Sequence, residues 1–407
     1  MAEAALVLAG VLAVLTAARV GLAAAALRRG PVVRRPGGAP GAAGTGRAAA
    51  AAAGQGPSDG AAPVTVLVAV RSGDPLMPAM LRENVASIGR TPHARLVLLV
   101  DEDDAPGRDA AAQALAVAPD LVTVVPCAPP EPGRNPKVVK LVVGLERADA
   151  LVAVLDDDTV LPDGALGVAR DALAAGHLVT GLPVYREQGS LWSRLVAAFV
   201  NGSALVTYLP LARVAPPVTV NGMFVLTRRD VLEGLGGFAA ISGEVCDDYA
   251  LARLYRDAGL TLVQTTVTHP LATTVPGPRA YARILRRWMV FSQEVLRRDL
   301  TPAMVALVVL PAVLPLLALA LAVASGRPAV VAAVVAVLVS KVLAVAALRR
   351  RVPGAPRGAL GVVLELVADL LTPVHAVGAL VGPRRVAWRD RQIRTGPAGP
   401  VMAGDAP

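Results

Sequence analysis

The sequence predicts an α/β domain with a doubly wound parallel sheet, flanked by transmembrane helices. The chain has 407 residues, of which 54% are hydrophobic, with a mean hydropathy of +0.56. That composition is too apolar for an ordinary soluble protein, whereas 17% of charged residues is too many for a pure membrane bundle. Short β-branched runs alternate with helical patterns in residues 63–155, and long apolar runs lie near both ends.

The first apolar run, residues 4–27, is long enough for one transmembrane helix and is broken only by Arg19. No charged segment precedes it and no cleavage site follows it, which favours a retained transmembrane anchor over a signal peptide. Residues 28–62 are rich in Gly, Ala and Pro and predict a flexible linker. Four arginines at its start place the downstream side in the cytoplasm: Arg28, Arg29, Arg34 and Arg35.

Residues 63–276 form the predicted cytoplasmic domain. Its strands are expected at four short apolar runs, which are residues 63–70, 95–100, 120–125 and 150–155. Helical patterns separate them near residues 77–89, 108–117 and 137–147. Strands that alternate with helices at this spacing favour a parallel sheet, and such a sheet binds ligands at the carboxyl ends of its strands.

The C-terminal part of the chain returns to the membrane. Residues 277–299 predict a basic, amphipathic interfacial helix that carries Trp288. Two transmembrane helices are predicted at residues 302–324 and 328–348, the second followed by three arginines. Residues 359–382 are interrupted by acids, a proline and a histidine, so they predict a re-entrant or interfacial element or a third C-terminal membrane helix. Residues 383–407 are expected to form a cytoplasmic tail.

Charge and cysteine content argue against two classes of protein. The net charge of +9 comes from 40 Lys and Arg against 31 Asp and Glu, and the basic residues cluster beside apolar runs. They lack interleaved aromatic residues, which favours an anionic membrane surface as partner and argues against nucleic acid. Cys127 and Cys246 show no CxxC pattern, so no disulfide framework or zinc site is predicted. The isolated His269 and His375 are interpreted as structural.

The strongest local signal for chemistry is the sequence LDDDT at residues 155–159. Asp156 and Asp158 follow a buried strand at a spacing that lets both carboxylates reach one point beyond it. Carboxylates are the ligands that Mg²⁺ and Mn²⁺ prefer, often together with substrate phosphates. A solvated acidic turn is the alternative, and for this motif by itself it is the favoured interpretation.

Two further groups lie at the same predicted edge of the sheet. Asp101 and Asp103 follow the second strand and are candidates for binding the base or ribose of a nucleotide; an acidic loop without a ligand is an equal alternative. Lys137, with Lys140, opens a helix that has Pro136 at its first position. A helix N-terminus combined with a cation is a good place for a diphosphate or a base carbonyl, and an ordinary N-terminal turn is the alternative.

Asp247 and Asp248 open a later helical stretch, DDYALARLYRDAGL. One of these carboxylates is a candidate general base, because a hydroxyl that attacks a sugar must lose its proton. Two adjacent acids at the start of a helix are also a common N-terminal charge pair, and this is the favoured interpretation of the pair considered alone.

In six motifs that occur in order, the chain resembles the ceramide glucosyltransferase-like branch of the family 2 glycosyltransferase superfamily. It also resembles bacterial hopanoid-associated glycosyltransferases. The motifs, within residues 63–292, are DEDDAP, GRNPKVVKL, LDDDTVLPDGAL, NGMFVLTRRDVLEGLGGF, CDDYALARLYRDAG and RILRRW. The resemblance implies a GT-A (nucleotide-sugar-binding, Rossmann-like) fold, an inverting transfer, a divalent metal (Mg²⁺ or Mn²⁺) and a lipid acceptor.

The resemblance also implies roles for single residues. Asp101 or Asp103 matches the acid at the nucleotide, Asp156 and Asp158 match the DxD with Asp158 favoured as the direct metal ligand, and Asp248 matches the catalytic base, preceded by Asp247.

The end of the (Q/R)xxRW motif corresponds to Arg287 and Trp288, near the donor diphosphate and the acceptor. The first position of that motif falls on Ile284, so either Arg283 fills the role through a shift of one residue, or Arg286 and Arg287 act together.

The expected function is therefore the transfer of a hexose, of the glucose or GlcNAc type, from a UDP-sugar to the hydroxyl of a membrane lipid. A ceramide-, diacylglycerol- or hopanoid-like lipid is the expected acceptor. The dominance of Ala, Gly, Val and Arg indicates a high-GC bacterial genome, so we expect a multi-pass protein of the bacterial inner membrane. A processive polysaccharide synthase on the same fold and a non-catalytic membrane scaffold are the alternatives.

Overall fold

The computed structural model describes residues 1–30, 32–33, 62–355 and 358–382, together with the backbone of residues 385–388, 391–396 and 399–402. The chain divides into two compact units. The α/β unit comprises Pro31–Pro183, Pro216–Thr274 and Ala387–Pro407, and the helical unit comprises Met1–Gly30, Val184–Ala215 and Val275–Val386. The predicted linker lies outside the described residues except at 28–30, 32–33 and 62, and so do the side chains of the predicted tail.

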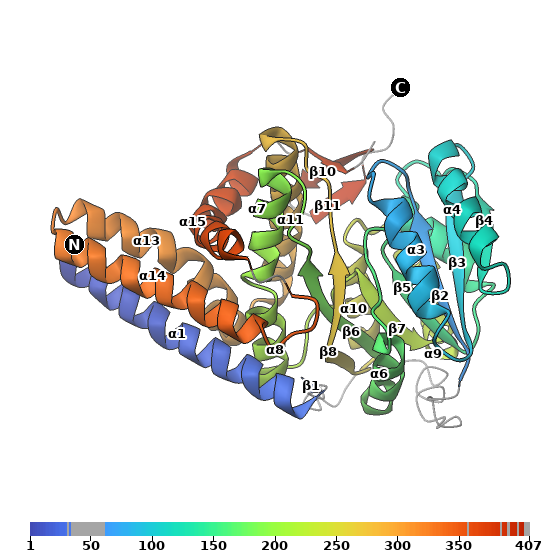
Figure 1. Cartoon of the computed structure of the whole chain (residues 1–407), viewed down its shortest axis with the longest axis horizontal. Helices are drawn as coiled ribbons and strands as arrows, with labels where there is room; N and C mark the ends of the chain where they lie inside the picture. The colour runs from blue at the N-terminus through green and yellow to red at the C-terminus, as the bar shows by residue number, and fades with distance from the viewer. Residues whose placement is uncertain are drawn as a thin grey trace. The chain divides into compact units, whose positions relative to one another are not determined.

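The α/β unit is built on an eight-stranded sheet of order β1-β8-β6-β7-β5-β2-β3-β4 (Figure 1). In chain order the strands are β1 (Val32–Val33), β2 (Val64–Val70), β3 (Ala94–Asp101), β4 (Val122–Cys127), β5 (Leu151–Leu155), β6 (Leu178–Tyr185), β7 (Phe224–Arg228) and β8 (Leu262–Leu271). β9 (Arg385–Trp388), β10 (Arg391–Gly396) and β11 (Gly399–Met402) form a separate three-stranded sheet.

Helices cover both faces of the large sheet, which confirms the predicted α/β class. α3 (Met77–Ile88), α4 (Ala105–Val117) and α6 (Ala165–Ala172) pack on one face. α5 (Pro136–Leu145), α9 (Arg229–Gly234) and α10 (Asp247–Asp257) pack on the other. The strands β2, β5 and β6 are almost fully buried, which is why they read in the sequence as apolar runs.

Strand direction differs from the prediction in the second half of the sheet. β5, β2, β3 and β4 are parallel, as predicted. β7 instead runs antiparallel to both β5 and β6, so that the sheet as a whole is mixed. A strand buried on both faces has the same apolar pattern in either direction, so the pattern could not reveal that β7 inserts between β5 and β6.

The helical unit contains α1 (Ala2–Arg29), α7 (Leu191–Asn201), α8 (Leu205–Val214) and α11 (Pro278–Asp299). The chain continues through α12 (Pro302–Met304), a π-helical turn and α13 (Leu310–Ala324) to α14 (Pro328–Arg349) and α15 (Ala359–Val381). Five helical segments of the described residues are long and apolar enough to cross a membrane: Ala2–Arg29, Leu191–Val214, Pro302–Ala324, Pro328–Arg349 and Ala359–Val381. These segments mark the chain as a membrane protein.

The segment Leu191–Val214 is the one candidate membrane span among the described residues that the sequence analysis does not predict. The sequence places it within the predicted soluble domain, whereas it packs inside the helical unit, against α1 and α15. Arg194 and the Asn-Gly-Ser stretch after Val200 interrupt its apolar pattern, so it does not stand out as a span. The structure buries 67% of its most apolar 18-residue window, which separates it from the other four segments.

Arg19, the one charged residue within the first apolar run, joins α1 to α8. Its Nε donates to the carbonyl oxygen of Val206 at 2.8 Å, and its guanidinium also donates to Thr207 Oγ1 at 3.0 Å. Pro210 lies four residues after Val206 in α8 and has no N–H to donate to that carbonyl. The arginine therefore takes the place of the missing helical hydrogen bond.

α15 is one continuous helix whose charged residues face other helices of the same unit. Glu365 pairs with Arg349, and Asp369 pairs with Lys341, both on α14. On the opposite side α15 exposes a stripe of large apolar side chains, which are Leu360, Val363, Val367, Val374, Val377, Leu380 and Val381. A helix with paired charges on its inner face and an apolar outer face has the character of a membrane element.

Candidate active site

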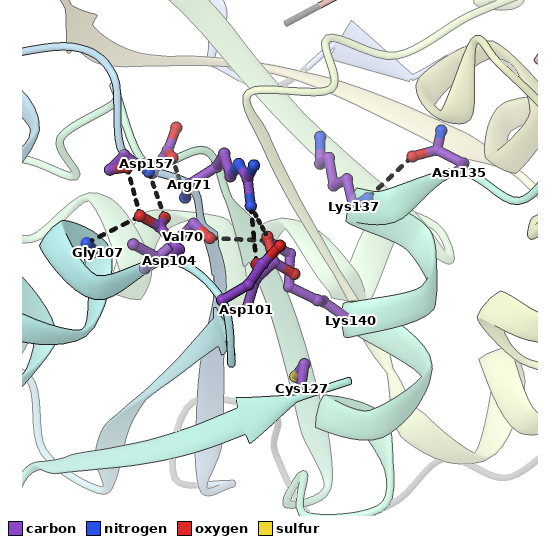
Figure 2. A network of polar contacts seen from close by, with 12 residues as sticks. Val70, Arg71, Asp101, Asp104, Gly107, Cys127, Asn135, Lys137, Lys140 and Asp157 are labelled. Carbon is purple, nitrogen blue, oxygen red and sulfur yellow. Dashed lines mark hydrogen bonds and ion pairs between the residues drawn. The ribbon is translucent and has the colours of Figure 1, made fainter. Parts of the chain in front are cut away.

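The acidic residues singled out in the sequence gather at one edge of the large sheet. β3 and β5 each pair in parallel with β2, and Asp156 follows β5 at its carboxyl end. Arg71 follows β2 and Asp101 ends β3 (Figure 2). The start of α5 lies at the same edge, because its side chains contact residues at the ends of β2, β3 and β5. This is the edge at which an open α/β sheet binds its ligands.

Asp101 is a buried carboxylate held by two cations. Its Oδ2 lies 2.9 Å from Lys140 Nζ and 3.1 Å from an Arg71 guanidinium nitrogen. Lys140 also donates to the carbonyl oxygen of Val70 at 2.7 Å, and Arg71 reaches Asp103 at 3.3 Å. The second oxygen of Asp101, Oδ1, is buried and has no hydrogen-bond partner among the described residues. An acceptor of this kind suits an N–H or O–H group of a ligand.

Asp104 and Asp157 brace the backbone of this edge. Asp104 caps α4 by accepting from the N–H of Gly107 at 3.1 Å, and it accepts from the N–H of Ser72 at 2.6 Å and from the Ser72 hydroxyl. Burial alone would raise the pKa of Asp104, but the Ser72 hydrogen bonds lower it. Asp157 accepts from the N–H of Arg71 at 2.8 Å. The middle acid of LDDDT therefore supports the backbone of this edge.

Lys137 is the centre of a second group of charges. Asn135 caps α5 and accepts from the N–H of Lys137 at 3.0 Å, which directs the lysine from the first turn of the helix (Figure 2). Lys137 Nζ lies 2.7 Å from Asp156, 2.9 Å from Asp247 and 3.2 Å from the carbonyl oxygen of Gly222. Burial alone would lower the pKa of Lys137, but the two carboxylates outweigh it and raise the pKa, so the side chain stays charged.

Asp248 lies beside this group at the start of α10. Its Oδ1 accepts from the N–H of Tyr249 at 2.7 Å and from the thiol of Cys246 at 3.1 Å. Burial, followed by the neighbouring Asp247, raises the pKa of Asp248 above its ordinary value. A carboxylate with a raised pKa is a better proton acceptor, which suits a general base. Asp247 and Asp248 line a small, mainly apolar cavity in the α/β unit, together with Gly222.

Asp158 is half-buried at the end of the β5 loop and accepts from the hydroxyl of Thr159 at 3.2 Å. Within the described part of the chain, no three His, Cys, Asp or Glu side chains lie together as a complete metal site. Mg²⁺ is commonly held by one or two carboxylates plus substrate phosphates, and a single acid beside a diphosphate site fits that mode. The role of Asp158 as metal ligand stays a prediction.

Three predicted site residues belong to α11, in the helical unit: Arg283, Arg287 and Trp288. Trp288 packs against the rings of Tyr185 and Phe199, at centroid distances of 6.3 and 6.0 Å. Arg283 is exposed and lies one helical turn before Arg287 on the same face of α11. The roles of these residues remain predictions.

One protein-family model matches most of the chain. The model of Glycosyl transferase family 21 matches residues 42–400. The chain belongs to glycosyl transferase family 21. This match confirms the expected resemblance. It also confirms the GT-A fold class, which agrees with the mixed α/β sheet.

Solved structures similar to this family 21 glycosyltransferase are distant from it. One is a mannosyltransferase, PcManGT, from Pyrobaculum calidifontis in complex with GDP-Man and Mn²⁺; it is 18% identical, the match covers 92% of this chain and 99% of that one, and the TM-score is 0.47. Another is the glucosyl-3-phosphoglycerate synthase of Mycobacterium tuberculosis in complex with Mn²⁺, UDP-glucose and phosphoglyceric acid. It is 16% identical, with 63% and 84% of the two chains covered and a TM-score of 0.32.

Several residues at this edge of the sheet were given no role in the sequence analysis. Arg71 directly follows β2, so its position at a strand end was available as a signal. Gly222 lies within the NGMF motif and His269 was interpreted as structural, but their contacts with Lys137 and Asn221 depend on residues far away in the chain. Asp156 and Asp247, by contrast, both pair with Lys137, and Asp248 lies next to them.

Proposed function

We propose that this family 21 glycosyltransferase transfers a hexose of the glucose or GlcNAc type from a UDP-sugar to the hydroxyl of a membrane lipid. The observation that carries the proposal is the convergence of Asp156 and Asp247 on the Lys137 ammonium, with Asp248 next to them. These groups come from three separate stretches of sequence. They provide a cation for a diphosphate, acids for a metal and a base for a hydroxyl within one small region.

The donor would lie along the carboxyl edge of the parallel strands. The unpartnered Oδ1 of Asp101 would accept a hydrogen bond from the base or ribose, which favours a base such as uracil that presents an N–H. Lys137 and the N-terminus of α5 would attract the diphosphate. Asp158, beside Asp156, would hold Mg²⁺ or Mn²⁺, whose chemistry is to neutralise the diphosphate as it leaves.

Asp248 would act on the acceptor. As the acceptor hydroxyl attacks the anomeric carbon, its proton moves to the Asp248 carboxylate, and the bond to the diphosphate breaks on the opposite side of that carbon. The configuration of the sugar is inverted by this single displacement. The raised pKa of Asp248, caused by burial and by Asp247, favours uptake of that proton.

The helical unit supports a lipid as acceptor. It supplies five segments that can cross a membrane, and α15 offers an apolar outer stripe. The arginines that end α1, Arg28 and Arg29, favour a cytoplasmic α/β unit in a multi-pass protein of the bacterial inner membrane. A ceramide-, diacylglycerol- or hopanoid-like lipid meets the requirement for a hydroxyl at the membrane surface. Among the described residues, three segments that can cross a membrane follow residue 276, and this small number argues against a channel for a growing polymer.

The test is incubation of the purified protein in lipid vesicles with a panel of UDP- and GDP-sugars and Mn²⁺ or Mg²⁺, followed by mass spectrometry of the lipids. We expect a glycolipid that carries one hexose, formed from a UDP-sugar and only in the presence of metal. Asp158→Ala and Asp248→Asn should abolish it, whereas Asp163→Asn, which changes an exposed acid paired with Arg90, should not. A polymer product would support the synthase alternative, and full activity of both site variants would refute the assigned roles.

A further inference from the structure

The turn Asn221–Met223 contacts Lys137, Asp156 and Asp248 of the proposed site through its backbone. The carbonyl oxygen of Gly222 accepts from Lys137 at 3.2 Å, and the carbonyl oxygen of Met223 accepts from the N–H of Asp156 at 3.0 Å. Gly222 also lies against Asp248, because a Cβ added to it would stand 2.7 Å from the Cβ of that acid. This turn, which we name the platform turn, therefore lies against the lysine and two of the acids.

Asn221 stabilises the platform turn through hydrogen bonds of its side chain and of its backbone N–H. Its side-chain oxygen accepts from the N–H of Met223 at 3.1 Å, and its own N–H donates to the Thr180 hydroxyl at 3.2 Å. Asn221 is 7% exposed, so these bonds are shielded from water. The position of the turn thus depends on where the Asn221 side chain is held.

His269 fixes the Asn221 side chain through a hydrogen bond. It lies on β8, is fully buried, and places its Nε2 at 3.1 Å from the side-chain oxygen of Asn221. Because an amide oxygen can only accept, Nε2 carries the proton of this hydrogen bond. Burial lowers the pKa of His269 to about 3, so the ring is neutral at physiological pH.

The neighbouring strand is shaped to fit the ring. A Cβ added to Gly181 on β6 would stand 2.6 Å from the carbonyl oxygen of Val267 and 2.9 Å from Nδ1 of His269, so a larger residue there would crowd both the backbone of β8 and the ring. Nδ1 has no hydrogen-bond partner among the described residues, so Nε2 provides the ring's polar anchor. His269 therefore does more than fill the core, because its Nε2–H donates to one acceptor, the side-chain oxygen of Asn221 in the platform turn.

We propose that His269 is a positioning residue for glycosyl transfer, which acts through Asn221 to hold the platform turn and with it the spacing of Asp156, Lys137 and Asp248. The inference rests on the proposed function of that site. His269 contributes a fixed N–H donor, and it neither takes up a proton nor contacts a substrate. The sequence led us to interpret His269 as structural, and the proposal adds an indirect role in catalysis.

The test compares two substitutions of His269 with a matched histidine. His269→Met removes the donor while it keeps an apolar side chain of similar length, and His269→Gln keeps an amide N–H near the place of Nε2. The control is His177→Met in the same unit, since His177 is half-buried and accepts from the N–H of Thr261 at 3.1 Å.

We expect His269→Met to lower kcat/KM for sugar transfer about 10²-fold, mainly through kcat, as small displacements of reacting groups do. His269→Gln should recover activity to within about threefold of the unmodified protein, because the donor is restored. His177→Met should leave kcat/KM unchanged while lowering Tm. Unchanged kcat/KM in His269→Met, equal losses in the Met and Gln variants, or an equal loss in His177→Met would overturn the proposal.

Hydrogen–deuterium exchange tests the same inference without any activity. The N–H of Met223 should exchange faster in His269→Met than in the unmodified protein, and at the unmodified rate in His269→Gln, because its acceptor is the side chain that His269 holds. If the unmodified protein transfers no sugar, the proposed function fails while exchange still tests the anchor. Identical exchange at Met223 in all variants would refute the anchor itself.

Discussion

Replacement of Gly222 by Ala tests how closely the platform turn packs against the proposed base. The backbone of Gly222 does not have a positive φ, so alanine can adopt its conformation, and any effect arises from space alone. The new Cβ would stand 2.7 Å from Asp248 Cβ and 3.2 Å from its Cγ. Carbon atoms pack best at about 3.5–4.0 Å, so the turn or Asp248 must move by about 1 Å.

A displacement of about 1 Å at a reacting group lowers the rate about 10²-fold, which corresponds to about 2.7 kcal/mol in activation free energy. The overpacked contact should also reduce the free energy of unfolding by about 1–3 kcal/mol. We therefore expect kcat for Gly222→Ala to fall about 10²-fold at a temperature at which the protein stays folded.

The assay is the initial rate of glycolipid formation at saturating UDP-sugar, with thermal unfolding measured on the same samples. Gly167→Ala is the matched control, because Gly167 lies in α6 with nothing within 4 Å of an added Cβ. That variant should keep full activity and gain about 0.5–1 kcal/mol in stability from the better helix former. If Gly222→Ala retains full kcat, the base does not depend on the platform turn, and the reasoning is refuted.

Three further predictions concern other parts of the chain. Gly361→Ala should raise Tm less than Gly167→Ala does, measured by thermal unfolding in detergent, because displacing the Glu187 carboxylate from the start of α15, at a cost of about 0.3–1 kcal/mol, offsets the gain of about 0.5–1 kcal/mol from the better helix former; an equal gain in both variants would contradict it. Arg19→Leu should cost about 1–3 kcal/mol by leaving a buried carbonyl unpaired, and adding Pro210→Ala should restore stability by supplying the helical N–H; a double variant no more stable than Arg19→Leu would refute this pairing. Because burial raises the pKa of Asp248 and a base must be ionised, kcat/KM should fall with decreasing pH at a pH above the ordinary carboxyl range; an acid limb at or below about pH 4 would count against this base.

Local sequence patterns determine much of this protein. The strands β2, β3, β4 and β5 lie within two residues of their predicted positions, since each is a short apolar run bounded by turn residues. The acids after β3 and β5 meet at one edge because parallel strands end on the same side of a sheet. The start of α5 follows from Asn135 and Pro136, and it explains why Lys137 lies at the site.

Tertiary structure decides the features that depend on residues far apart in the chain. The antiparallel insertion of β7, and the packing of Leu191–Val214 within the helical unit, have no local signature that separates them from the alternatives. Lys137 meets Gly222 across 85 positions, and His269 meets Asn221 across 48. Composition and spacing state which side chains are available, but a hydrogen bond or a steric contact acts over a few ångströms, so folding alone selects which of them meet.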